Sequence, residues 1–166
     1  MFVKSQVWGT VLIAALAASS VVAQDRTADL RARFEKETDP VHKAKLVPRL
    51  ADAEFRDIQA SIGAGKLAEA AVIAHQASDE ARTAREALDA TKRDPEKHPE
   101  GYRQLQISVR ESVRRLDDIL VGLGADDQEP FREVRNQMEE VERRLIHGLF
   151  PHRPPEPGTG TVTPKS

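Results

Sequence analysis

The most regular stretch of the sequence lies between Lys66 and Ala90 and reads KLAEAAVIAHQASDEARTAREALDA. Apolar residues recur in it at alternating spacings of three and four, as on one face of an α-helix. Most of them are alanine, the residue with the highest helix propensity, whose small side chain lets a neighbouring helix come close. The sequence therefore predicts a helix with a packing stripe made of Leu67, Ala70, Ala74, Ala77, Ala81, Ala84 and Leu88.

The segment before this helix is its predicted packing partner, across a turn at Gly63–Gly65. It begins at Asp39, a good N-cap residue, with Pro40 in the first turn. Pro48 lies inside the helical pattern and predicts a kink or a broken first turn. Self-association of two copies through the alanine stripe is the alternative to packing within one chain. The bulky residues available to cover the stripe are Phe55, Ile58 and Ile62.

Three further helices follow from the same spacing, a short one at 27–37 and two that begin near Pro99 and Pro130. No stretch alternates with a period of two, so we expect no strand. The predicted fold class is all-α, with four main helices in two antiparallel, bundle-like hairpins and a short N-terminal helix. The apolar faces of the last two helices are Tyr102, Leu105, Val109, Val113, Leu116, Leu120 and Leu123, and then Phe131, Val134, Met138, Val141, Leu145 and Leu149.

The turn sequence Gly65-Lys66-Leu67-Ala68-Glu69-Ala70 resembles the turn of a tetratricopeptide repeat. The resemblance covers one hairpin, residues 47–90, and it implies a helical hairpin. Ile58 and Arg82 depart from the pattern, where that family keeps a small residue and a proline. No second copy appears at an offset of about 34 residues.

The stretches Asp39–Leu46 (DPVHKAKL) and Arg110–Asp117 (RESVRRLD) also resemble a group of uncharacterised exported all-helical bacterial proteins. This resemblance extends over most of the chain. It implies a helical fold and an extracytoplasmic location, and it implies no activity.

Residues 1–23 have the pattern of a secretory signal peptide. Lys4 precedes an apolar run from Val7 to Ala18, and short side chains lead to a cleavage site after Ala23. The apolar run is shorter than the ~20 residues of a membrane span, so we expect no stable span after processing. An uncleaved N-terminal anchor is the alternative. The expected location is periplasmic or extracellular.

Composition divides the remainder into a helical domain, 24–150, and a tail, 151–166. The tail holds five of the ten prolines and almost nothing apolar, so we expect it to be disordered; a protein ligand or a cell-wall spacer are alternatives. Without the signal, the chain has 24 Lys and Arg residues (25 less Lys4) and 27 Asp and Glu residues. The resulting formal charge of −3 disfavours nucleic-acid binding. The absence of cysteine excludes disulfides, thiolate metal sites and the lipoprotein route.

Catalytic motifs are missing from the sequence. The five histidines form no His-Glu-x-x-His motif, and the many carboxylates lie among arginines on faces expected to be solvated. Met138 is expected in the core. We therefore expect a non-enzymatic protein without catalytic, cofactor or metal residues, which acts through a protein partner in the cell envelope. The alternative is a small-ligand or metal/haem carrier that uses the bundle core and His75.

Overall fold

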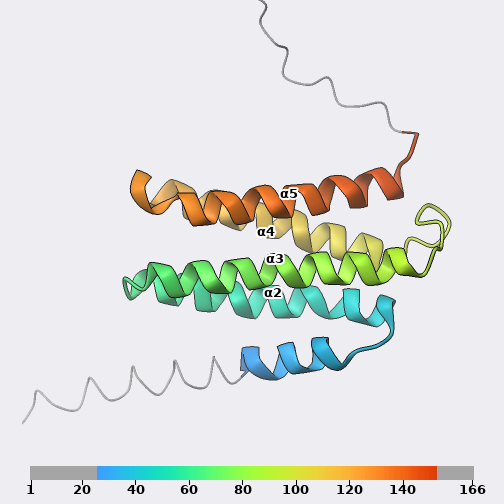
Figure 1. Cartoon of the computed structure of the whole chain (residues 1–166), viewed down its shortest axis with the longest axis horizontal. Coiled ribbons are helices and arrows are strands. Elements are labelled where there is room, and N and C mark those ends of the chain that lie inside the picture. The colour runs from blue at the N-terminus through green and yellow to red at the C-terminus, as the bar shows by residue number, and fades with distance from the viewer. Residues whose placement is uncertain (1–25, 153–166) are drawn as a thin grey trace, which may run out of the picture.

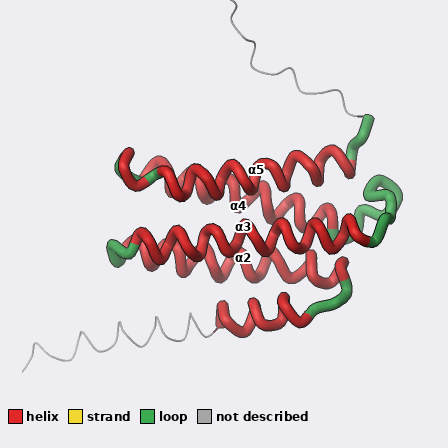
Figure 2. Tube along the Cα trace, in the orientation of Figure 1, coloured by secondary structure: helices red, strands yellow, loops and turns green. Residues whose placement is uncertain are grey.

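A computed structural model of the chain describes residues 26–152, and these form helices and connecting loops without any strand (Figure 2). The predicted signal segment lies outside the described residues, as does the tail from residue 153 onward. The described helices are 26–36, α2 (Pro40–Gly63), α3 (Leu67–Ala90), α4 (Tyr102–Gly122), the short 3₁₀ helix η1 (Ala125–Asp127) and α5 (Glu129–Leu149).

The start of α2 agrees with the sequence. Asp39 is the N-cap, and its carboxylate accepts a hydrogen bond from the backbone N–H of His42 at 2.7 Å. The predicted broken first turn is not seen, because helical residues continue through Pro48 to Gly63. Burial of the neighbouring Val47 and Leu50 holds the helix together where the proline lacks an N–H donor.

The start of α4 differs from the sequence prediction. The helix begins at Tyr102, three residues after Pro99, because Gly101 adopts φ = 80°, which lies outside the right-handed helical region. The side chain of Gln104 closes this end by accepting a hydrogen bond from the N–H of Gly101 at 3.0 Å.

The helices pack in neighbouring pairs (Figure 1). Helix α2 lies along α3 and α4 lies along α5, while α2 also contacts α4 and α3 also contacts α5. Helix 26–36 lies on the side of the α2–α3 pair that faces away from α4 and α5 (Figure 1). Helices α3 and α4 also contact each other, so each of them packs against three of the main helices.

One continuous apolar core runs between these helices. In the alanine stripe of α3 only Leu67 is half-buried, and the other six residues are buried. Bulk opposite the small alanines comes from Phe55 and Ile58 on α2 and from large residues on α4 and α5. No helix within residues 26–152 is both long and apolar enough to cross a membrane. The largest fully buried apolar side chains are Phe131, Leu50, Ile58, Leu88, Leu105, Leu116, Met138 and Leu145.

Candidate functional site

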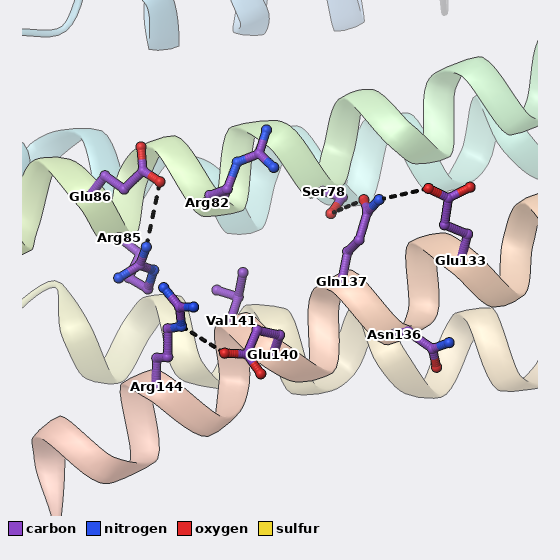
Figure 3. A pocket seen from close by; sticks show the side chains of 10 residues that line it. All are labelled: Ser78, Arg82, Arg85, Glu86, Glu133, Asn136, Gln137, Glu140, Val141 and Arg144. Carbon is purple, nitrogen blue, oxygen red and sulfur yellow. Dashed lines mark hydrogen bonds and ion pairs between the residues drawn. The ribbon is translucent and has the colours of Figure 1, made fainter.

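A cleft with a volume of about 510 Å³ lies between α3 and α5 and is lined mostly by polar and charged residues (Figure 3). Side chains from both helices line it, and they include three arginines, three glutamates and two amides. Together these groups offer hydrogen-bond donors, acceptors and both signs of charge. The lining residues are Ser78, Arg82, Arg85 and Glu86 from α3 and Glu133, Asn136, Gln137, Glu140, Val141 and Arg144 from α5.

The two walls of the cleft are joined at one end by a hydrogen-bond chain (Figure 3). The hydroxyl of Ser78 donates to Oε1 of Gln137 at 3.2 Å, and Nε2 of Gln137 donates to Glu133 at 3.2 Å. The chain orients the Gln137 amide and ties α5 to α3 at this point. The remaining lining groups do not bridge the two helices by any hydrogen bond or ion pair found in the described part of the chain.

The arginines of the cleft keep hydrogen-bonding capacity for a ligand. Arg85 binds Asp89 through Nη1 at 2.5 Å, but its Nε is buried without a hydrogen-bond partner. Arg144 pairs with Glu140 at 2.7 Å, and this hydrogen bond lowers the pKa of the Glu140 carboxyl group. Arg82 and Arg144 are both more than half exposed. Each guanidinium has five donors, so these pairs leave donors that can bind carboxylate or carbonyl oxygens.

A second polar cluster lies buried under helix 26–36. The guanidinium of Arg31 reaches Glu54 on α2 through Nη2 at 2.6 Å and Glu80 on α3 through Nε at 3.0 Å. Glu54 is 1% exposed and Glu80 is 8% exposed. Three segments that are far apart in the sequence therefore meet at one cation.

Burial dominates the electrostatics of this cluster. Removal from water, reinforced by the neighbouring Glu80 carboxylate, raises the pKa of Glu54 to about 8 against the opposing effect of Arg31. Removal from water also raises the pKa of Glu80, although Arg31 counteracts this. Two carboxyl groups thus share one guanidinium in a site with little water.

The structure separates the residues that the sequence singled out. His75 is half-buried on α3, Met138 is buried in the core, and His42, His98, His147 and His152 are exposed. Within residues 26–152 no three His, Cys, Asp or Glu side chains are grouped so that they could hold a metal ion.

Sequence reasoning missed Arg31, Glu54 and Glu80. A signal for Glu54 was present, because it lies four residues after Leu50 and four before Ile58, on the same face as those buried residues.

Comparison of the chain with protein-family models, with curated proteins and with solved structures gave no match.

Proposed function

We propose that the chain is an exported, non-enzymatic helical protein in which two antiparallel hairpins, α2–α3 and α4–α5, present the α3–α5 cleft to a protein partner in the cell envelope. The cleft is the observation that carries this proposal. Its donors and acceptors lie on two different helices, and side chains of this kind pair readily with the backbone and side chains of another polypeptide. The signal pattern of residues 1–23 supports the location.

The arginines give this contact its chemistry. Arg85 has a buried Nε without a partner, and Arg82 and Arg144, which also line the cleft, have exposed guanidinium groups. Arginine is enriched at protein interfaces, where its planar group binds carboxylates in two-point fashion. The proposed partner therefore places one or more carboxylate groups in the cleft.

A pull-down from an envelope extract under mild salt tests the proposal, with each captured protein then purified and titrated against the chain. The variant Arg82→Ala/Arg144→Ala removes two exposed cleft arginines. Its matched control is Arg110→Ala/Arg114→Ala, which removes two exposed arginines from α4. We expect the cleft variant to lose at least about tenfold in affinity and the control to bind as the unaltered chain does.

Equal binding by the cleft variant and the control would exclude the cleft as the contact site. Recovery of no partner, together with a measurable hydrolytic or redox activity of the purified protein, would overturn the non-enzymatic proposal. The carrier alternative stays a prediction, since no observation on residues 26–152 favours it. Metal analysis and visible absorbance of protein purified from its native compartment test that alternative.

A further inference from the structure

Helix 26–36 is attached to the α2–α3 pair by one cation that serves two buried carboxyl groups. Arg31 bridges Glu54 and Glu80, which lie on different helices, at 2.6 and 3.0 Å. Around this cluster Phe34 is buried under the ammonium group of Lys43, Thr27 is buried and Leu30 is partly buried. The polar cluster is thus the part of the attachment that carries ionisable carboxyl groups out of water.

The charges of the cluster do not balance when both carboxyl groups are ionised. Helix 26–36 contributes Arg31 and, farther out, Glu35, α2 contributes Glu54, and α3 contributes Glu80. Within residues 26–152, Arg31 is the cation that forms ion pairs with the two buried carboxylates. One buried negative charge thus remains uncompensated, which is costly in a site removed from water.

A single proton corrects both the charge and the hydrogen bonding. Oε2 of Glu54 is buried and has no hydrogen-bond partner while the carboxyl groups act only as acceptors. A protonated Glu54 becomes a donor, and Glu80 is the acceptor beside it. Carboxyl pairs that are close together in proteins share a proton in this way.

We infer that Glu54 and Glu80 form a proton-binding site, and that the bound proton decides whether helix 26–36 stays packed on the α2–α3 pair. With the proton bound, the cluster is neutral and Arg31 bridges both groups. Without it, the excess negative charge favours detachment, because the carboxylates then reach water. The raised pKa of Glu54, about 8, supports this assignment.

The direction of the effect follows from the two states of the helix. In the detached state Glu54 reaches water and titrates near its ordinary value of 4.5, whereas in the packed state it titrates near 8. The packed state therefore holds the proton over the pH range between these values, and detachment becomes more favourable as pH rises through that range. The site lies on the face of α3 opposite to Ser78, Arg82 and Arg85, so it acts independently of the proposed partner cleft.

Hydrogen exchange on the whole purified protein tests the inference. We expect the opening equilibrium of amides 27–36, corrected for intrinsic exchange rates, to rise at least about tenfold between pH values of about 6 and about 8. Glu54→Gln, which keeps the shape and cannot ionise, is expected to remove this dependence. The exposed control Glu96→Gln is expected to keep it.

Infrared spectroscopy of the same proteins detects directly whether a carboxyl group of the site is protonated. We expect the C=O band of a buried carboxylic acid at neutral pH in the unaltered protein, lost in Glu54→Gln. An unchanged pH dependence in Glu54→Gln, or no carboxylic acid band in the unaltered protein, would overturn the inference. If Glu54→Gln does not fold, as judged by circular dichroism, Glu80→Gln removes an ionisable group from the same site and must flatten the same dependence.

Discussion

Gly101, in the turn before α4, lies directly against the side chain of Leu88 near the end of α3. A Cβ atom placed on Gly101 would lie 2.9 Å from Cδ2 of Leu88 and 3.4 Å from Cα of Val41. Gly101 also has φ = 80°, a conformation that residues with a side chain rarely adopt. The glycine thus lets the α3–α4 connection close over the start of α2.

Gly101→Ala is expected to lower the free energy of unfolding by about 2 kcal/mol, because it combines backbone strain with a clash. Urea denaturation measures the change. The matched control is Gly122→Ala at the end of α4, where an added Cβ meets nothing within 4 Å. There we expect no loss, and a gain of up to about 1 kcal/mol. Equal effects at both sites would show that the Leu88 contact is not responsible.

Global stability should depend on pH through Glu54. Its pKa is raised from 4.5 to about 8 in the folded chain, so the folded state binds more protons than the unfolded state between these values. The contribution of Glu54 to the free energy of unfolding is therefore greatest below pH 4.5 and falls as pH rises toward 8. Other carboxyl groups have their own pH dependence, so the measurement is the difference between the unaltered chain and Glu54→Gln. This difference should amount to a few kcal/mol over the range; a constant difference would contradict the prediction.

Close packing around the alanine stripe of α3 should make it intolerant of larger residues. Ala74 is buried at 1% exposure, and Ala74→Leu is expected to cost about 1–3 kcal/mol through overpacking. Ala68 lies on the exposed side of the same helix, and Ala68→Leu should change stability by no more than about 0.5 kcal/mol. Thermal unfolding of the two variants side by side makes the comparison. The prediction fails if Ala74→Leu is as stable as Ala68→Leu.

The N-cap of α2 should contribute measurably to stability. The Asp39 carboxylate accepts the N–H of His42, so Asp39→Ala leaves that donor without its partner and should cost about 1 kcal/mol. Asp39→Asn keeps an acceptor oxygen and serves as the control, with an expected change of a few tenths of a kcal/mol. Chemical denaturation resolves the difference, and a loss of equal size in Asn and Ala would exclude capping as its cause.

Local spacing predicted the helices well, because apolar periodicity and capping residues act over a few positions. Asp39 and the glycines at Gly63–Gly65 marked the ends of α2 within a residue. The start of α4 was predicted at Pro99 and lies at Tyr102, because Gly101 adopts φ = 80° at a place where Leu88 of another element leaves no room for a side chain. A sequence pattern carries no information on such a contact.

The polar sites were harder to predict because they depend on which helices become neighbours. Ser78 and Gln137 meet only because α3 lies along α5, and nothing in the spacing of either helix requires this. Arg31, Glu54 and Glu80 likewise come from three segments, and their charges resemble the solvated charges around them. The sequence indicated burial for Glu54 alone, because it lies four residues after Leu50 and four before Ile58 on one helix face.

The two helices that form the α3–α5 cleft are far apart in the chain, so α3 is synthesised well before α5. Ser78 and Gln137 are 59 positions apart, whereas α2 and α3 are joined by a turn of a few residues and can pair as soon as both have emerged. The proton-binding site needs residues only as far as α3, whereas the cleft also needs α5. A chain that stops before α5 never acquires the cleft, and it leaves the inner faces of α3 and α4 open to water and to other chains.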